Sequence, residues 1–307
     1  MVRTTVESLI IRNYHHMKIL IIGRGYVGDR CAKAWDNAVV SEKMVSSKQD
    51  VLALLDEHKP DAVLNAAGVR GRPNVDWCET HQLETILGNT KLPITIAEAC
   101  QERGVYLLHI GSGCIFYGDS PHSDKRWREN DMGNPTEVTY SRTKWAADLV
   151  LSTLPNTGIA RIRMPIDFVP SEQNMIDKLA TFPKVIDVEN SVTIVDDMVN
   201  VFYQLLEKKA PGIFHVTNPG TIKHREIVAL YEELVDPSHS NEWITNDDLV
   251  KQGLATKTRS NNFLASERLA EFGIEMREVH QAMRDTMEKY AKLKKEGAAM
   301  VPDGPVC

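Results

Sequence analysis

A tyrosine and a lysine four residues apart are the side chains in this sequence best suited to chemistry. Tyr140 and Lys144 bound the run Tyr-Ser-Arg-Thr-Lys, and in a helix a spacing of four places two side chains on one face. The lysine ammonium then favours the phenolate and draws the tyrosine pKa down from its ordinary value of about 10. The pair is predicted to donate a proton to a carbonyl that is being reduced. YxxxK alone is common, so the prediction depends on its surroundings.

A serine and a cysteine further along the chain are candidates for the same site. Ser112 follows a predicted strand at 105–110, where its hydroxyl would bind the carbonyl oxygen. A plain Gly-Ser-Gly turn is the simpler interpretation of this serine. Cys114 lies two residues later and is a candidate thiol acid or base facing the substrate. The alternative is a small buried apolar cysteine, which most free cysteines are.

Glycines spaced as GxGxxG stand near the start of the chain, in the run Gly23-Arg24-Gly25-Tyr26-Val27-Gly28. The run follows a predicted strand at 18–22 and opens a predicted helix, which is the context of a dinucleotide-binding turn. Gly23 permits the tight turn, Gly25 lets the backbone approach a pyrophosphate, and Gly28 allows close packing of helix on strand. The predicted cofactor site also includes Ala66, Ala67 and Gly68 after the strand at 61–65, together with Tyr140 and Lys144.

Charged residues near the second strand bear on the choice between NAD and NADP. A carboxylate there binds a ribose diol, whereas a cation accommodates a 2′-phosphate. Glu42 suits the first role, and Arg24 and Lys43 suit the second. We favour NADPH over NAD(H) because two cations flank the site, although Lys43 is equally well an ordinary surface charge.

Strands alternate with helices along the chain, which predicts an α/β fold with a doubly wound, Rossmann-like parallel sheet. Strands are expected at 18–22, 39–40, 61–65, 105–110, 159–162, 185–186 and 213–216, and helices at 29–36, 49–57, 90–102, 143–152, 196–207 and 225–234. We divide the chain into an N-terminal extension (1–16), an NAD(P)-binding domain (17–165), a smaller, mainly substrate-binding C-terminal lobe (166–299) and a tail (300–307). Some strand and helix elements of the C-terminal half are expected to return to the first domain.

Composition excludes several classes of protein. The chain has 307 residues, a formal charge of -6 and no sustained basic stripe, so nucleic acid and membrane surfaces are not expected partners. No apolar run approaches the roughly 20 residues that span a bilayer. Five cysteines without a CxxC pair suggest neither disulfides nor a metal site. A soluble, cytoplasmic enzyme acting on a small molecule is expected.

Several motifs resemble a known family, the plant-type nucleotide-rhamnose synthases, within the extended short-chain dehydrogenases. They are Gly-Val-Arg-Gly-Arg-Pro-Asn-Val-Asp-Trp-Cys-Glu (68–79), Gly-Cys-Ile-Phe (113–116), the Tyr140 and Lys144 pair, Arg-Met-Pro (163–165) and Arg-Ser-Asn-Asn (259–262). A more distant resemblance is to dTDP-4-dehydrorhamnose reductase and GDP-fucose synthase. The resemblance implies NADPH-dependent 3,5-epimerisation and 4-keto reduction of a nucleotide-4-keto-6-deoxy-glucose, with UDP preferred and dTDP possible, giving nucleotide-L-rhamnose.

The resemblance also implies roles for individual residues. Inversion next to a ketone needs a base on one face and an acid on the other, and these roles would belong to Cys114 and Lys184. Without the resemblance, Lys184 would be a solvated lysine before a strand. Substrate contacts are implied for Arg72, Asn74, Arg163, Met164, Pro165, Arg259 and Asn261. Asn74 is equally a helix N-cap, and the residues at 259–262 are equally a polar loop.

The sequence departs from the family in its glycine turn, which is one residue shorter than the expected GxxGxxG, and in having Ser112 where threonine is common. Two alternatives stay open. One is a 4-keto reductase without epimerase activity, and the other is a silent dinucleotide-binding regulatory subunit. A homodimer through the helix bearing Tyr140 is possible, since Trp145 and Leu149 on that helix are apolar.

Overall fold

A six-stranded parallel sheet forms the centre of the computed structural model, which describes residues 17–72 and 74–297. The strands follow the order β11-β6-β4-β3-β1-β2. They are β1 (Ile19–Ile22), β2 (Ala38–Val40), β3 (Ala62–Asn65), β4 (Tyr106–Ser112), β6 (Thr157–Ile162) and β11 (Gly212–His215). The predicted doubly wound α/β fold is confirmed. The predicted extension at 1–16 and the tail at 300–307 lie outside the described residues.

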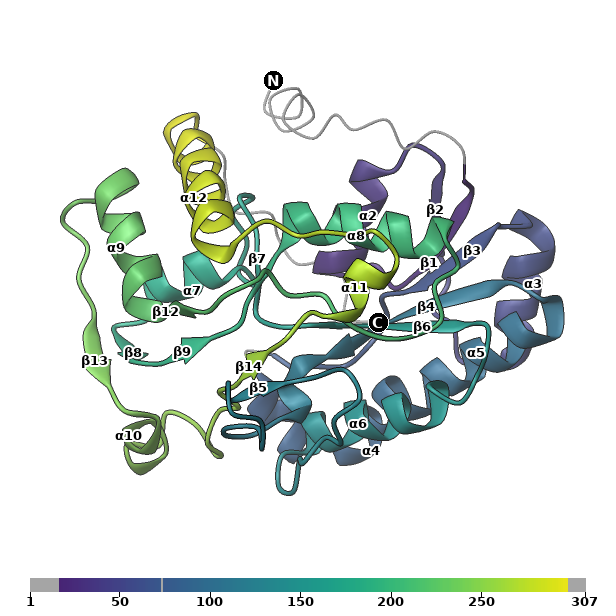
Figure 1. Cartoon of the computed structure of the whole chain (residues 1–307), viewed down its shortest axis with the longest axis horizontal. Helices are drawn as coiled ribbons and strands as arrows, with labels where there is room; N and C mark the ends of the chain where they lie inside the picture. The colour runs from purple at the N-terminus through teal and green to yellow at the C-terminus, as the bar shows by residue number, and fades with distance from the viewer. Residues whose placement is uncertain (1–16, 73, 298–307) are drawn as a thin grey trace.

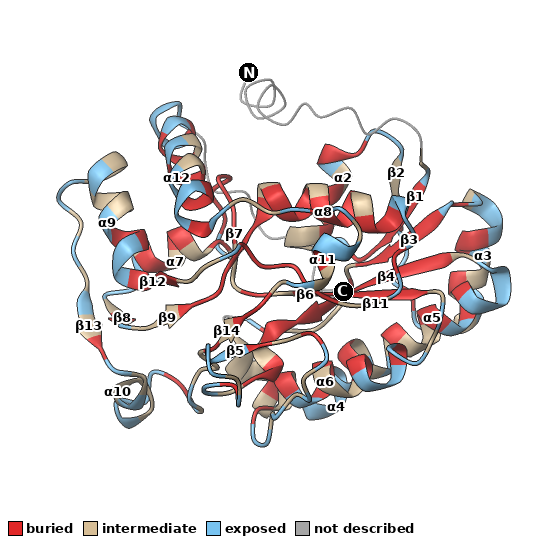
Figure 2. Cartoon of the chain, viewed as in Figure 1, coloured by how far each residue is buried: buried red, intermediate tan, exposed pale blue. Residues whose placement is uncertain are grey.

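Helices cover both faces of this sheet (Figure 1). One face carries α2 (Tyr26–Ala34) and α8 (Val195–Glu207), and the other carries α3 (Lys48–His58), α5 (Leu92–Arg103) and α6 (Thr139–Leu151). Because successive strand residues point to opposite faces, Ile19 and Ile21 of β1 pack in the first layer and Leu20 and Ile22 in the second. Figure 2 shows the buried strands between the two helical layers.

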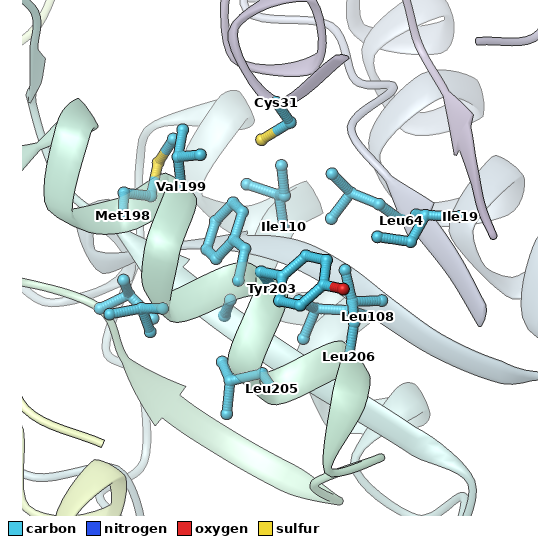
Figure 3. Packing of buried hydrophobic residues seen from close by; sticks show 14 of the residues in the cluster. Ile19, Cys31, Leu64, Leu108, Ile110, Met198, Val199, Tyr203, Leu205 and Leu206 are labelled. Atoms are coloured by element: carbon cyan, nitrogen blue, oxygen red, sulfur yellow. The ribbon is translucent and has the colours of Figure 1, made fainter. Parts of the chain in front are cut away.

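The helix α8 comes from the second half of the chain and completes the sheet's first hydrophobic layer. Figure 3 shows its apolar side chains, among them Met198 and Leu206, packed against Leu108 and Ile110 of β4. Strand β11 follows this helix and pairs with β6 at the edge of the sheet. The sheet layer is therefore built from both halves of the chain.

A second hydrophobic cluster holds together the smaller part of the molecule, at the left of Figure 1. The elements of this smaller part are α7 (Met175–Thr181), β8 (Lys184–Ile186), β9 (Glu189–Asn190), β12 (Ile222–Lys223), α9 (His224–Leu234), β13 (Glu242–Ile244), α10 (Asn246–Lys251) and α12 (Val279–Lys295). Two short parallel pairs, β7 (Pro165–Ile166) with β10 (Thr193–Ile194) and β5 (Arg126–Trp127) with β14 (Phe263–Leu264), join distant segments. A short helix, α11 (Arg268–Glu271), packs beside β11.

Short helical turns position the segments around the carboxyl ends of the strands. They are η1 (Val75–Glu79), α4 (Gln82–Ile86), the π-helix η2 (Leu87–Lys91) and η3 (Gly113–Ile115). No helix in the described ranges is long and apolar enough to cross a membrane.

Helix α6 begins at Thr139 rather than at the predicted residue 143. Its first turn is capped from another element, because one oxygen of Glu79 accepts a hydrogen bond from the Thr139 amide at 2.8 Å and the other accepts one from the Thr139 hydroxyl at 3.2 Å. A carboxylate suits this end of a helix, where amides are free and the helix dipole is positive. The earlier start places Tyr140 and Lys144 on the same helix.

Candidate active site

A cavity of about 370 Å³ lies where β1, β3, β4 and β6 end, the edge at which open α/β folds bind ligands. Many of the residues singled out from the sequence line it. They are Gly23, Arg24, Gly25, Tyr26, Val27, Ala66, Ala67, Gly68, Arg72, Ser112, Cys114, Tyr140, Lys144, Met164 and Pro165. The structure thus brings the glycine turn and the chemistry-bearing side chains to one place.

The glycine turn has the geometry that a phosphate needs. Gly23 has φ +115°, and a Cβ there would lie 2.4 Å from the Ala67 amide nitrogen. Gly28 packs so closely that a Cβ would lie 2.2 Å from the Gly23 carbonyl oxygen, whereas Gly25 faces open space. Gly25 is the N-cap of α2 and supplies no side-chain cap, so the first amides of the helix are available to an anion. These residues fit a dinucleotide pyrophosphate.

The charge of the cavity also favours anionic ligands. Arg24, Arg70, Arg72 and Lys144 line it, and no aspartate or glutamate of the described chain is among its lining residues. Burial lowers the pKa of Lys144 to about 8, while the charge of Asp148 acts in the opposite direction. Four cationic side chains without a carboxylate among the described lining residues suit the phosphates of nucleotides.

The environment of Tyr140 differs from the sequence-based expectation. Burial, followed by the charge of Cys114, raises its pKa above the ordinary range, and a hydrogen bond with Ser112 lowers it. The Lys144 ammonium instead donates to the Ile110 carbonyl at 3.2 Å. The expectation that Lys144 draws the Tyr140 pKa down was wrong, because burial dominates and the ammonium is engaged by backbone. A neutral phenol is a proton donor in this position.

Lys144 is held close to the cofactor side of the cavity by the segment after β3. A Cβ on Gly68 would lie 3.2 Å from the Lys144 Nζ and 3.2 Å from the Asn89 Oδ1. Asn89, in the π-helix η2, binds the backbone of Val69 through both ends of its amide, at 2.7 Å each. This amide clamp fixes the loop that lies over the ammonium.

Ser112 and Cys114 lie together at the end of β4. Ser112 is buried and caps η3, its hydroxyl accepting from the Cys114 amide at 3.2 Å. Cys114 is half-buried and lines the cavity, unlike the buried thiols of Cys31, Cys78 and Cys100. The thiol of Cys114 therefore faces the space that a substrate would fill.

Arg163 is more deeply placed than a substrate contact would be. Its side chain is 1% exposed and does not line the cavity. The guanidinium donates to the Ser260 carbonyl at 2.6 Å, to the Asn190 side chain, and to the Cys114 Sγ at 3.5 Å. Beside it, Met164 adopts φ +43°, a backbone conformation that is strained for this residue type and frequent at functional sites.

Other predicted residues lie away from the cavity lining. Lys184 on β8 donates to Gln252 at 2.9 Å and pairs with Glu242 at 3.1 Å. Lys43 is exposed and follows β2, where its carbonyl accepts from the Ser41 hydroxyl at 2.8 Å. The structure does not bring Lys184 or Lys43 together with Cys114 and Tyr140.

The predicted polar residues at 74 and 259–261 bind within the protein. Asn74 is the N-cap of η1, its side chain accepting from the Asp76 amide at 2.8 Å. Arg259 forms a two-pronged pair with Asp76, with both N–O distances at 2.8 Å. The amide of Asn261 accepts from Asn190 at 3.0 Å. These contacts join the loop before β14 to the loop after β3.

Sequence reasoning missed some lining residues, notably Arg70 and Gln173, whose side chains hydrogen-bond to each other at 3.1 Å. Arg70 stands inside the motif at 68–79, so its position after β3 could have marked it. Gln173 carries no comparable signal, because it comes from the segment before α7 and reaches the cavity only through the fold.

Two plant proteins of Arabidopsis thaliana are among the curated relatives. A bifunctional dTDP-4-dehydrorhamnose 3,5-epimerase/dTDP-4-dehydrorhamnose reductase is 36% identical over 80% of this chain and 82% of its own length. A trifunctional UDP-glucose 4,6-dehydratase/UDP-4-keto-6-deoxy-D-glucose 3,5-epimerase/UDP-4-keto-L-rhamnose-reductase is 31% identical over 90% of this chain. The match covers 42% of that trifunctional protein.

Among solved structures, the UDP-rhamnose synthase from Acanthamoeba polyphaga mimivirus superposes with a TM-score of 0.83 at 27% identity. The superposition covers 90% of this chain and all of that one. The family model described as the RmlD substrate binding domain matches residues 17–292. The resemblance seen in the sequence motifs is confirmed, and the chain belongs to the RmlD substrate-binding-domain family.

Proposed function

We propose that this enzyme of the short-chain dehydrogenase type inverts C3 and C5 of a nucleotide-4-keto-6-deoxy-glucose and then reduces its 4-keto group with NADPH. The product is a nucleotide-L-rhamnose. The observation that carries the proposal is that Cys114, Ser112, Tyr140 and Lys144 line one cavity together with the glycine turn. A thiol and a phenol then face one substrate next to a dinucleotide site.

The reduction is assigned to the residues of α6 and β4. When bound, NADPH supplies hydride to C4. Tyr140 donates its phenolic proton to the C4 oxygen as that oxygen gains electrons. Ser112, which hydrogen-bonds Tyr140, holds the same oxygen. Lys144 is assigned to the nicotinamide ribose, which its ammonium can reach with the donors that the Ile110 carbonyl does not engage.

The inversion is assigned to Cys114. A thiolate takes the proton from a ring carbon next to the ketone, and the electron pair moves onto the C4 oxygen to give an enolate. A proton delivered to the opposite face then completes the inversion. Lys184 is not placed for that second role, since its ammonium binds Glu242 on β13 and Gln252 at the end of α10. We therefore assign Cys114 as the base and assign no residue as the acid.

NADPH is preferred to NAD(H) because Arg24 lines the cavity at the glycine turn and is exposed there. A 2′-phosphate has a cationic partner in this position. UDP is the preferred nucleotide, supported by the likeness in fold to the viral UDP-rhamnose synthase. A dTDP substrate stays the alternative, since the bifunctional relative is named for it.

The proposal is tested by NADPH oxidation with UDP- and dTDP-4-keto-6-deoxy-glucose. We expect NADPH consumption and an L-rhamnose nucleotide by NMR, with the larger kcat/KM for the UDP substrate. A D-configured product would show that only reduction takes place, and no oxidation with either substrate would contradict the proposed activity.

A reductase without epimerase activity is the second candidate, and the position of Lys184 outside the cavity lining favours it. Incubation with the 4-keto-6-deoxy sugar nucleotide in heavy water, without NADPH, separates the two. The bifunctional enzyme introduces deuterium at C3 and C5, whereas a reductase alone introduces none.

A homodimer through α6 belongs to the same proposal, as does a cytoplasmic location. Leu149 and Val150 on this helix are 43% and 46% exposed, so an apolar strip is available to a second copy. Trp145 packs inward instead, against Gly133 and Arg161. Sedimentation of the wild type and of a Leu149→Glu variant tests the dimer, which the charge should dissociate.

A further inference from the structure

Arg163 brings a positive charge to the floor of the cavity without reaching its surface. The residue follows β6, and its guanidinium lies behind Cys114, with one nitrogen 3.5 Å from the Sγ. Two contacts hold it from behind, the Asn190 side chain and the Ser260 carbonyl. A third, the Ser260 hydroxyl, lies 3.3 Å from the nitrogen that contacts the thiol. The guanidinium is thus fixed in orientation and aimed at the sulfur.

Within the described residues, no carboxylate forms an ion pair with this guanidinium. Its partners are an amide, a carbonyl, a hydroxyl and a thiol, and its Nε is buried without a hydrogen-bond partner. A buried charge without an opposite charge is costly. The thiol is the partner that can supply the missing negative charge at hydrogen-bonding distance.

Three titratable side chains near Arg163 and Cys114 are neutral near pH 7. Charged groups lie beyond them: Glu79 acts on Tyr117, Arg70 on Tyr140 and Asp187 on His224. Burial raises the pKa of Tyr117 to about 12 and also raises that of Tyr140. Burial lowers the pKa of His224, on the Arg163 side, to about 4. None of these three groups cancels the guanidinium charge, so the charge acts on the sulfur.

We infer that Arg163 is a positioning residue that holds Cys114 as a thiolate, ready to remove a proton from the sugar ring. This role rests on the proposed function, in which Cys114 is the base of the inversion. Before the step the sulfur is anionic and the ring carbon carries the proton. After it, the sulfur carries the proton, and the electron pair of the broken C–H bond lies on the C4 oxygen.

The inference changes the meaning of the Arg-Met-Pro motif. Arg163 does not bind substrate directly but favours the thiolate form of Cys114 and fixes the direction of its sulfur. The cation lowers the proton affinity of the sulfur but increases the fraction of Cys114 that is thiolate, and only the thiolate can accept a proton. Substrate contact stays with Cys114, at the cavity surface.

Alkylation of Cys114 by iodoacetamide, followed by mass spectrometry of the modified peptide across a pH series, tests the inference. At about pH 7 we expect the Arg163→Met rate to be roughly tenfold below the wild type, with the rate recovering as pH rises. Ser260→Ala removes one anchor but keeps the charge, and we expect its rate to stay within about twofold of the wild type. Equal rates in Arg163→Met and wild type would overturn the inference.

A second measurement uses proteins that keep Arg163, so the inference stays testable even if Arg163→Met does not fold. The ultraviolet thiolate absorbance of the wild type, minus that of Cys114→Ser, should be present at about pH 7. Its absence would also overturn the inference. Neither measurement uses substrate, so both can succeed while deuterium exchange fails, in which case the proposed epimerisation alone is wrong. Exchange in the wild type with unchanged alkylation in Arg163→Met would overturn only the role of Arg163.

Discussion

Arg161 and Arg163 stand two residues apart at the end of one strand, and both are buried, at 0% and 1% exposure. Arg161 has a carboxylate partner, since its Nε lies 2.8 Å from Asp148 and both side chains are fully buried. Arg163 has no such partner in the described chain and contacts a thiol at the cavity instead. The charge of Arg161 is therefore balanced by a carboxylate inside the fold, whereas the partner of Arg163 is a thiol at the cavity.

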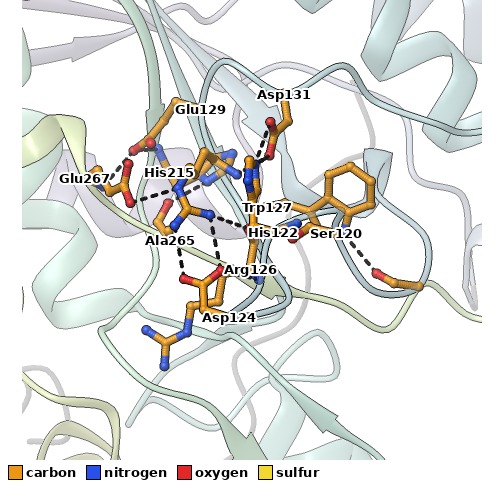
Figure 4. Close-up of polar contacts among 12 residues, drawn as sticks. Ser120, His122, Asp124, Arg126, Trp127, Glu129, Asp131, His215, Ala265 and Glu267 are labelled. Carbon is orange, nitrogen blue, oxygen red and sulfur yellow. Dashed lines mark hydrogen bonds and ion pairs between the residues drawn. The ribbon is translucent and has the colours of Figure 1, made fainter.

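The surroundings of Arg161 explain why its role is structural. Its guanidinium also donates to the Glu129 carbonyl at 3.2 Å and lies 3.2 Å from the His215 ring. Glu129 in turn accepts from the His215 amide at 3.3 Å, among the polar contacts that join the segment around β5 to the sheet (Figure 4). The carboxyl of Asp148, whose pKa burial raises and the Arg161 charge lowers, serves to hold the structure together. The sulfur beside the second arginine lies at the cavity, where it can exchange a proton with a substrate.

The largest expected effect comes from breaking the Arg161 pair. Asp148→Ala leaves a buried guanidinium without its carboxylate and should lower the free energy of unfolding by about 3–5 kcal/mol. Urea unfolding measures this loss, and Cys114 alkylation in the folded variant serves as the control that should not change. A loss below about 1 kcal/mol would mean that Asp148 does not neutralise Arg161.

The second prediction separates the thiol from the phenol within the cavity. Tyr140→Phe removes the proton donor and should lower the rate of NADPH oxidation by about 100-fold or more. Deuterium exchange at C3 and C5 should continue, because the thiolate of Cys114 is untouched. Stopped-flow oxidation and NMR on the same preparation measure both, and oxidation at the parent rate would refute the role of Tyr140.

The third prediction concerns pH. Lys144 is protonated below its pKa of about 8 and neutral above it, since burial lowers this pKa from 10.5. If the ammonium is needed, reduction should fall about tenfold per pH unit as pH rises beyond that value. The kcat profile of Lys144→Met, lower throughout, should lack this inflection. A flat wild-type profile up to about pH 10 would show that the ammonium is not needed.

The smallest effect is expected from a third arginine, Arg259, which pairs with Asp76 outside the cavity lining. The two side chains are 23% and 18% exposed, so solvent screens the pair. Asp76→Asn should cost less than about 1 kcal/mol of unfolding free energy by urea titration. A loss of unfolding free energy as large as that of Asp148→Ala would show that the Arg259–Asp76 pair stabilises the fold as much as the buried Arg161–Asp148 pair does.

The fold could be predicted from the sequence because its signals are local. The short apolar strands, such as β1 and β3, and the glycine turn at 23–28 are each recognisable from a few consecutive residues. Tyr140 and Lys144 were found for the same reason, since their spacing is a property of one helix. The start of that helix was wrong by four residues because its cap, Glu79, lies 60 residues away.

The parts that could not be predicted depend on long-range contacts. Arg163 resembled a substrate contact, but Ser260, 97 residues further on, covers it from behind. Lys184 was assigned from resemblance alone, and its place on β8 beside Glu242 depends on how the second hydrophobic cluster packs. A spacing along the chain contains no information about such pairs.

The claim that one cavity carries two activities is tested most directly by Cys114→Ala. In heavy water without NADPH, the wild type should introduce deuterium at C3 and C5 of the 4-keto-6-deoxy sugar nucleotide, and the variant should introduce none. The variant should still oxidise NADPH with a substrate whose C3 and C5 are already inverted. Exchange in Cys114→Ala at the wild-type rate would contradict the account.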